Sequence, residues 1–384
     1  MGLAIVIGPP VKLRLNWRAV SILLILCAIA IRLIAVELRP SFLRPGLHLF
    51  AYVGNTDDGT INIVDLVRLA RLATIWVGPG PSGIRAHPTR DEIWGLSSAG
   101  GYVWVLDAKT SQVVARIPVG AAPYALDFSP DGRRAYVAAS GANTVVAIDC
   151  VARRVAATGR AGRRPWIARV TPDGKTVAVS NRDDSTLSLL DASTLAPLAP
   201  PIPVAPQPEQ LAILPDSSKL FATSGAATQI SVVDLRRHVL LANLDLGSRP
   251  DDLILKPDGG ELYIPSSEAH GLLIVNTETN EVGDFLLVGM APRGGALAPD
   301  LGLLYVSDSA AGHIVPIAID TRRTLRPITV GQSPLTARLT PGGDILLVVD
   351  AVSNDLAVIR AKTSSLITLI PLGTHPRDLA VKVF

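Results

Sequence analysis

The stretch IPVGAAPYALDFSPDGRRAYVAASGANTVVAID, residues 117–149, contains one unit of a repeat that runs through most of this chain. Short apolar segments such as ALDF (125–128) alternate with turn-forming residues, and the turn at 129–132 reads Ser-Pro-Asp-Gly. Proline presets the backbone angle of such a turn, while Asp and Gly accept its strained positions. Short strands separated by regular turn signals predict an all-β repeat.

One proline sets the length of the repeat, because its successive copies lie 42 or 43 residues apart. A glycine stands three residues before every copy except one, where Ala205 replaces it. Eight copies at this spacing predict eight structural units. The copies are Pro81, Pro123, Pro165, Pro208, Pro250, Pro292, Pro334 and Pro376.

Four short strands in each unit match one blade of a β-propeller. A single blade cannot bury both faces of its sheet, whereas stacked blades cover one another, and the ring must close or leave an edge exposed. Segment 378–384 is a first strand without a second, and segment 47–55 is a second strand without a first. We therefore predict an all-β, eight-bladed propeller of four-stranded blades, closed by pairing of the C-terminal strand with the N-terminal strands.

Composition excludes several classes of protein. Hydrophobic residues make up 48% of the chain and charged residues 18%, which is too apolar for disorder. The formal net charge of +3 comes from residues 1–30, which hold Lys12, Arg14 and Arg18 and no acid, so the body is neutral (+3 − 3 = 0). A neutral body lacks the basic face that nucleic-acid binding needs. The two cysteines, Cys27 and Cys150, cannot form a disulfide framework.

The N-terminal sequence has the pattern of an export signal, and its basic flank disfavours the alternative of a buried N-terminal helix. The apolar run 19–31 follows the basic residues and has the length of a signal-peptide core, and Ala28-Ile29-Ala30 offers a cleavage site. Continuation through 33–36 would give roughly 18 residues, near the lower limit for a membrane anchor. Both alternatives export the body, because the positive charges precede the apolar run.

These patterns divide the chain into three parts and give its location. We predict a signal peptide or membrane anchor with a hydrophobic helix at 1–36, a linker at 37–46 and the propeller at 47–384. We also expect a periplasmic or extracellular monomer that touches a membrane only through its N-terminal segment.

Several pieces of the repeat resemble the YVTN-repeat propellers over about residues 47–384. The pieces include AYVGN (51–55), LYVSD (304–308) and ITVGQSPLTARLTPGG (328–343). The resemblance implies a propeller related to lactonases, to the haem-binding propeller of cytochrome nitrite reductases and to amine dehydrogenase heavy chains. Many such proteins have seven blades, whereas the haem-binding propellers have eight. Because the motif residues form turns and core, they do not choose among these functions.

The residues beside the repeated proline vary strongly, although all eight units need the same fold. We expect them to ring the mouth of the central channel, where arginines could clamp a carboxylate or phosphate and aromatic rings could stack on a planar group. The predicted ligand-binding residues are Tyr124, Arg164, Trp166, Glu209, Arg249, Asp251, Arg293, His375 and Arg377.

Simpler roles remain open for these residues. Arg249 beside Asp251, or Arg377 beside Asp378, could form solvated ion pairs, which contribute about 0–1 kcal/mol each, and Trp166 could be a wedge between blades. Calcium could bind Glu209, Asp251 and Asp252, but the nearby arginines oppose a cation, so we predict no metal site.

The histidines limit the possible chemistry. We expect His87 and His238 to lie in turns and face water, whereas His270, His313 and His375 could serve as axial haem ligands or general bases. The sequence has no Cys-x-x-Cys-His haem attachment site and no Gly-x-Ser-x-Gly elbow.

Our first interpretation is therefore an exported, non-catalytic propeller, without catalytic residues or a resident cofactor, that binds a small anionic or aromatic ligand or a protein partner. The alternatives are a lactonase-like hydrolase, with His375 or Glu209 as its base, and a haem or tetrapyrrole-binding propeller.

Overall fold

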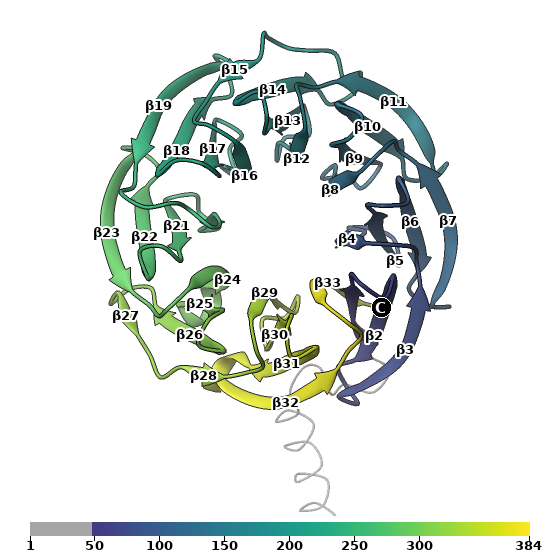
Figure 1. Cartoon of the computed structure of the whole chain (residues 1–384), viewed down its shortest axis with the longest axis vertical. Helices are drawn as coiled ribbons and strands as arrows, with labels where there is room; N and C mark the ends of the chain where they lie inside the picture. The colour runs from purple at the N-terminus through teal and green to yellow at the C-terminus, as the bar shows by residue number, and fades with distance from the viewer. Residues whose placement is uncertain (1–47) are drawn as a thin grey trace, which may run out of the picture. The chain divides into compact units, whose positions relative to one another are not determined.

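The computed structural model describes residues 48–384 as a ring of eight sheets around a central axis (Figure 1). The expected signal peptide or anchor with its hydrophobic helix at 1–36, the expected linker at 37–46 and residue 47 of the expected propeller lie outside the described residues. Within 48–384, no helix has the length and apolar character needed to cross a membrane.

In each of the first four blades, the strands follow one another from the channel outward. Blade 1 contains β33 (Pro376–Val383), β1 (Leu49–Asn55), β2 (Thr60–Asp65) and β3 (Ala70–Trp76). Blade 2 contains β4 (Pro81–Ala86), β5 (Glu92–Ser97), β6 (Tyr102–Asp107) and β7 (Gln112–Pro118). Blade 3 contains β8 (Pro123–Phe128), β9 (Arg134–Ala139), β10 (Thr144–Asp149) and β11 (Arg154–Arg160). Blade 4 contains β12 (Pro165–Val170), β13 (Thr176–Asn181), β14 (Thr186–Asp191) and β15 (Ile202–Pro203).

The other four blades follow the same order. Blade 5 contains β16 (Pro208–Ile213), β17 (Lys219–Ser224), β18 (Gln229–Asp234) and β19 (Val239–Asp245). Blade 6 contains β20 (Ile254–Leu255), β21 (Glu261–Ser266), β22 (Gly271–Asn276) and β23 (Glu281–Leu287). Blade 7 contains β24 (Pro292–Ala298), β25 (Leu303–Asp308) and β26 (His313–Ala318), with an outer strand split into β27 (Arg323–Thr324) and β28 (Ile328–Thr329). Blade 8 contains β29 (Pro334–Leu339), β30 (Ile345–Asp350), β31 (Asp355–Arg360) and β32 (Ser365–Pro371). Two 3-10 turns occupy Pro299–Leu301 and Ala361–Thr363.

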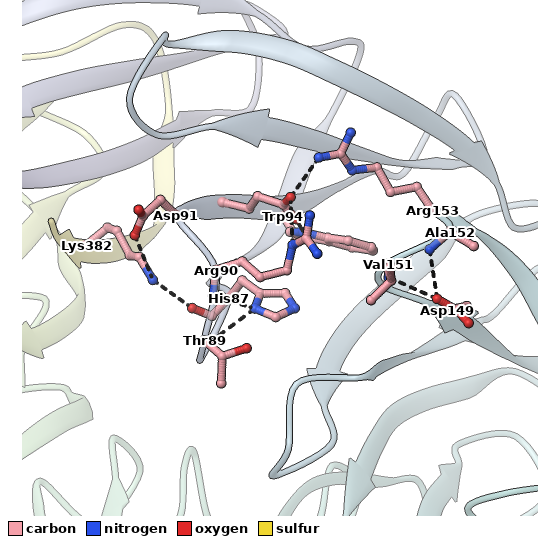
Figure 2. A network of polar contacts seen from close by, with 11 residues as sticks. His87, Thr89, Arg90, Asp91, Trp94, Asp149, Val151, Ala152, Arg153 and Lys382 are labelled. Carbon is pink, nitrogen blue, oxygen red and sulfur yellow. Dashed lines mark hydrogen bonds and ion pairs between the residues drawn. The ribbon is translucent and has the colours of Figure 1, made fainter.

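The prediction of eight four-stranded antiparallel blades is confirmed. The middle strands of a blade are apolar on both faces because each face packs on a neighbouring blade. Trp94 and Leu96 of blade 2, for example, share a buried cluster with Val137 and Ile148 of blade 3. The aspartate that ends many third strands has a local role: Asp149 Oδ1 accepts the amide hydrogens of the two turn residues that follow (Figure 2).

A tyrosine on the second strand ties three pairs of neighbouring blades together. In each case the phenol donates a hydrogen bond to a backbone carbonyl 56 residues further along, in the next blade. The repeat therefore supplies polar ties between blades as well as apolar packing. The pairs are Tyr52 to Ala108 (3.3 Å), Tyr136 to Ala192 (2.8 Å) and Tyr305 to Ala361 (2.6 Å).

Closure by the C-terminal strand is confirmed as well. Strand β33 pairs antiparallel with β1 along the whole of β1. Beyond this ladder, the backbones of His48 and Phe384 exchange two hydrogen bonds (3.1 and 3.0 Å), and their rings stack with centroids 5.4 Å apart. Blade 1 is thus built from both ends of the described chain.

A polar network beside this seam joins blades 1, 2 and 3 (Figure 2). Lys382 Nζ of β33 donates to the carbonyl of His87 (2.9 Å) and lies 4.0 Å from an Asp91 carboxylate oxygen. The buried Glu92 accepts hydrogen bonds from Arg153 of blade 3 and from Trp94. Burial alone would raise the pKa of Glu92, but its donors outweigh burial, and the pKa is lowered.

The expectation that His87 faces water is wrong, since only 1% of the residue is exposed. Its Nδ1 accepts the amide hydrogens of Thr89 (3.2 Å) and Arg90 (3.1 Å), and its ring lies 4.8 Å from that of Phe128 in blade 3. Burial lowers the pKa of this imidazole. The sequence signal of a turn was correct, but the next blade covers the turn.

Blade 8 holds two carboxyl groups where blades 1 and 4 have an amide and a hydroxyl. Asn55 Nδ2 donates to Thr60 Oγ1 (2.9 Å) across strands β1 and β2 of blade 1. At the same register, the fully buried Asp350 lies opposite Asp355, and the Oδ1 atoms of both are buried without a hydrogen-bond partner among the described residues. Burial, and then the adjacent Asp355 carboxyl group, raise the pKa of Asp350 to about 8.

Deletion of residues 378–384 is expected to open the ring and to destabilise every blade, because the first and last blades would each lose a covering neighbour. Thermal unfolding followed by circular dichroism should change from one cooperative transition to a broad, low-temperature one. As a matched control, Lys382→Met removes only the ties to blade 2 and should cost about 1 kcal/mol. An unchanged transition in the deletion variant would contradict closure through β33.

Asp350→Asn is expected to stabilise the protein at alkaline pH. The folded state keeps the Asp350 proton up to about pH 8, whereas an unfolded aspartate loses it near pH 4. The free energy of unfolding of the unsubstituted protein should therefore fall as the pH rises between these values. Asparagine has no such proton to lose, so the variant should lack this pH dependence. Its free energy of unfolding at pH 9, measured by urea unfolding, should exceed that of the unsubstituted protein by about 1–3 kcal/mol. Equal pH slopes for both proteins would show that Asp350 does not hold a proton.

Candidate functional site

A cavity of about 720 Å³ opens along the axis of the propeller. All eight blades contribute to its wall through their innermost strands or the residues just before them. Because these strands converge on one axis, side chains that lie some 42 residues apart in the sequence face a common space. In this cavity, every repeat can therefore contribute a group to the same ligand.

The wall of this cavity is rich in arginine. Its charged side chains are Arg85, Arg169, Arg293, Arg338, Arg377, Asp251, Asp252 and Asp378. Three of the arginines have acidic partners. Arg85 and Arg338 lie 3.3 and 3.9 Å from the Asp378 carboxylate, and Arg169 lies 3.8 Å from that of Asp127.

Arg293 and Arg377 differ from the other arginines of the wall. Neither guanidinium forms an ion pair or a side-chain hydrogen bond with any residue in 48–384. Both side chains are exposed to the solvent in the open cavity. They are therefore available to an anionic ligand without the prior loss of an internal partner.

The electrostatics of the channel favour a positive wall at mildly acidic pH. Removal from bulk water raises the pKa of Asp252 to about 6, against the opposing effects of a Leu253 amide hydrogen bond and of Arg338 and Arg169. Desolvation also lowers the pKa of Arg169 and Arg338, although a guanidinium stays protonated in proteins. Protonation of Asp252 would thus remove a negative charge from the wall while the arginines keep theirs.

An aromatic wall stands on blades 3 and 4. The rings of Tyr124 and Trp166 stack with centroids 3.6 Å apart and an interplanar angle of 26°. The guanidinium carbons of Arg164 and Arg182 lie 5.5 and 5.3 Å from the Trp166 ring centroid, within cation–π range. Tyr124 lines the channel cavity and also, with Trp166 and Arg164, a second cavity of about 450 Å³ beside it.

The structure separates the predicted site residues into two groups. Those directly after the repeated proline reach the channel cavity in six blades, and among them are Tyr124, Asp251, Arg293 and Arg377. Arg164, Arg249 and His375, directly before the proline, do not line it, and neither do Trp166 and Glu209, which follow it.

Hydrogen bonds to loops hold the residues that precede the proline. Arg164 and His375 have positive φ angles of 50° and 54°. The amide of Arg164 donates to Asn143 Oδ1, and the amide of His375 donates to Asn354 Oδ1, each in the loop of the preceding blade. This turn directs the side chain toward the loops between second and third strands rather than into the channel.

Several predicted residues have polar partners outside the channel cavity. The ion pairs are Glu209 with Arg182 (2.8 Å) and Arg249 with Glu268 (3.4 Å), and His375 Nδ1 lies 2.8 Å from an Asp57 carboxylate oxygen. Asp251, which does line the cavity, accepts the amide hydrogen of Ser267 (2.6 Å). A hydrolase that used His375 or Glu209 as its base would therefore need the substrate to bind outside the main cavity.

Sequence reasoning missed Arg85, Arg169 and Arg338, which stand four residues after their repeated prolines. A signal was present, since this position holds an arginine in three units and Asp127 in a fourth. Strict alternation along a strand would not place it on the same side as the residue directly after the proline. A bulge makes this possible, because the ladder slips at this point in the innermost strands, for example between Pro165 and Ala168.

Ligands for a metal are sparse around the channel. No group of three or more histidine, cysteine, aspartate or glutamate side chains in residues 48–384 is arranged to hold a metal ion. His270, His313 and His375 are absent from the cavity wall. His270 Nδ1 instead lies 2.6 Å from the carbonyl oxygen of Met290.

Comparisons with known proteins agree with this architecture. The family model of the cytochrome D1 heme domain matches residues 95–217, from β5 of blade 2 into blade 5. This stretch includes the aromatic wall and Arg169 but is less than half of the chain. A search of the curated proteins found no match.

Solved structures resemble the chain over most of its length. Dihydro-heme d1 dehydrogenase NirN in complex with DHE is 16% identical, with a TM-score of 0.75 over 89% of this chain and 76% of that one. Apo AztD from Citrobacter koseri is 12% identical, with a TM-score of 0.67 over 88% and 98%. Hydrazine synthase from Kuenenia stuttgartiensis is 20% identical, with a TM-score of 0.59 over 73% and 96%.

Identities this low establish the fold alone. Together with the family match, they confirm the resemblance to eight-bladed propellers of the cytochrome d1 and YVTN-like type.

The carboxyl group of Asp252 is expected to titrate near pH 6, about two pH units above an ordinary aspartate. Carbon-13 NMR of the labelled carboxyl group measures this value directly. Asp251→Asn should lower the pKa of Asp252 by removing a negative neighbour, and Arg338→Met should raise it by removing a positive one. A higher Asp252 pKa in Asp251→Asn, or a lower one in Arg338→Met, would contradict the assigned causes.

Proposed function

We propose that this protein is an exported propeller that binds an anionic, planar ligand of the tetrapyrrole class in its central channel. The observation that carries the proposal is the pair Arg293 and Arg377, two cavity arginines without an ion-pair partner among residues 48–384. A guanidinium recognises a carboxylate with two parallel hydrogen bonds, so such a pair suits a ligand with at least two carboxylates.

The aromatic wall supports a planar ligand. Tyr124 is 39% exposed at the cavity, and Trp166 stacks behind it. An exposed aromatic face stabilises a second ring by about 0.5–1.5 kcal/mol beyond simple burial. The cavity volume of about 720 Å³ also lies in the usual range for a small-molecule site.

The comparisons support the proposed ligand class. The matching family is described as a heme domain, and the NirN structure is of a complex with DHE. The residues of this channel suit the carboxylate-bearing edge of such a molecule, since five arginines line the wall. The same residues do not suit its iron, because no histidine, cysteine or methionine lines the cavity wall.

Export and a binding role without catalysis are further parts of the proposal. The basic and apolar N-terminal sequence favours a location outside the cytoplasm, where the segment 1–36 would act as a signal peptide or anchor and 47–384 as the propeller. A carrier or scaffold fits a channel whose wall contains neither of the candidate bases His375 and Glu209.

Substitution of the two unpaired arginines tests this function. Coproporphyrin, which has four carboxylates, should bind the purified propeller and quench its tryptophan fluorescence. Arg293→Gln with Arg377→Gln should weaken binding by about tenfold or more, since each lost charge-assisted hydrogen bond costs about 1.5–3 kcal/mol and solvent reduces that value here.

Arg249→Gln is the matched control. Arg249 is also an arginine beside a repeated proline, but it pairs with Glu268 outside the cavity. Its affinity for coproporphyrin should stay unchanged. Equal losses in the control and the double variant would point to a general charge effect, and an absence of binding by the unsubstituted protein would reject the proposed function.

A further inference from the structure

A tetrapyrrole presents two features to a protein: carboxylates at its edge and a metal at its centre. Iron in such a ring is held by a histidine, a cysteine thiolate, a methionine or a tyrosine. The wall of this channel contains one residue of these four types, Tyr124. Burial, and then the charge of Glu209, raise the pKa of Tyr124. The side chain is therefore a neutral phenol, a poor ligand for iron, and its ring is committed to the stack with Trp166.

Other potential iron ligands in residues 48–384 lie elsewhere. Cys150 is fully buried between blades 2 and 3, and burial raises its pKa to about 12. His375 pairs with Asp57, and His270 contacts the carbonyl of Met290. Each of these side chains already has a structural partner or environment away from the cavity wall.

The arginines, in contrast, form a continuous arc. Blades 7, 8, 1 and 2 are consecutive around the ring, and each contributes one arginine to the cavity wall. Blades 3 and 4 carry the aromatic wall, and blade 6 contributes Asp251 and Asp252. A ligand with several carboxylates along one edge would meet Arg293 and Arg377, which have no acidic partner in residues 48–384, and beside them Arg338 and Arg85, which both lie near the Asp378 carboxylate. The arc consists of Arg293, Arg338, Arg377 and Arg85.

We infer that this channel selects its tetrapyrrole by the carboxylate edge and not by the metal, so that metal-free and iron-containing forms bind equally well. The inference rests on the proposed function and adds its specificity: the ligand class is a polycarboxylated macrocycle, with or without a metal. The arginine arc supplies the recognition, and the described residues leave the centre of the ring without a protein ligand.

Three forms of one macrocycle separate the two features: metal-free coproporphyrin, its iron(III) complex and its uncharged tetramethyl ester. Tryptophan quenching should give dissociation constants for the first two within about threefold, a difference of roughly 0.6 kcal/mol. The ester should bind at least about tenfold more weakly, because it offers no anion to the arginines. The absorption spectrum of the bound iron form should lack the shift that a strong protein ligand produces.

Two variants strengthen the test. Arg293→Gln with Arg377→Gln should weaken the metal-free and iron forms by the same factor. Tyr124→Phe keeps the stacked ring but removes the phenol oxygen, and it should leave the ratio of the metal-free and iron dissociation constants unchanged.

The outcomes distinguish the inference from the function on which it rests. A more than tenfold preference for the iron form, or a ligand-induced spectral shift, would overturn the inference and leave the proposed function standing. Failure of both acid forms to bind would reject both. Equal binding of the ester and the acids would overturn recognition by the carboxylate edge, while the binding of a planar macrocycle would remain.

Discussion

The antiparallel pairing of β33 with β1 is the contact on which the rest of the molecule depends. Every blade has two apolar faces, and each face is covered only by a neighbour, so an open ring would expose two of them at once. The ladder, the His48–Phe384 backbone pair and the tie from Lys382 to His87 all act at this one seam. Closure also completes the channel, since the same strand carries Arg377 and Asp378 into the cavity wall.

The channel follows from that closure. Eight innermost strands converge on one axis, and a bulge near the start of several of them brings more residues of each strand to the wall than plain alternation would allow. Charges from remote repeats then act on one another. Arg85 and Arg338 come from blades on either side of blade 1, yet both lie near the Asp378 carboxylate. Arginine side chains that are far apart in the sequence can therefore act together in one binding site, with several blades each contributing one of them.

The repeat also identifies departures that folding does not require. Asn55 with Thr60 and Asn181 with Thr186 form the same hydrogen-bonded pair in blades 1 and 4. Blade 8 replaces that pair with Asp350 and Asp355, and burial then forces a proton onto the pair. The cost of this arrangement should depend on pH, whereas the amide–hydroxyl pairs are neutral at every pH.

Sequence alone was sufficient for the blade number, the strand order and the closure, because turn residues and the spaced proline act locally and recur eight times. It also located Tyr124, Asp251, Arg293 and Arg377 near the channel. It could not separate these from Arg249 and His375, nor find Arg85, Arg169 and Arg338. Those differences depend on positive-φ turns, on strand bulges and on which blade covers which loop. Such features exist only when the ring has formed, since each depends on contacts between repeats that are distant in the sequence.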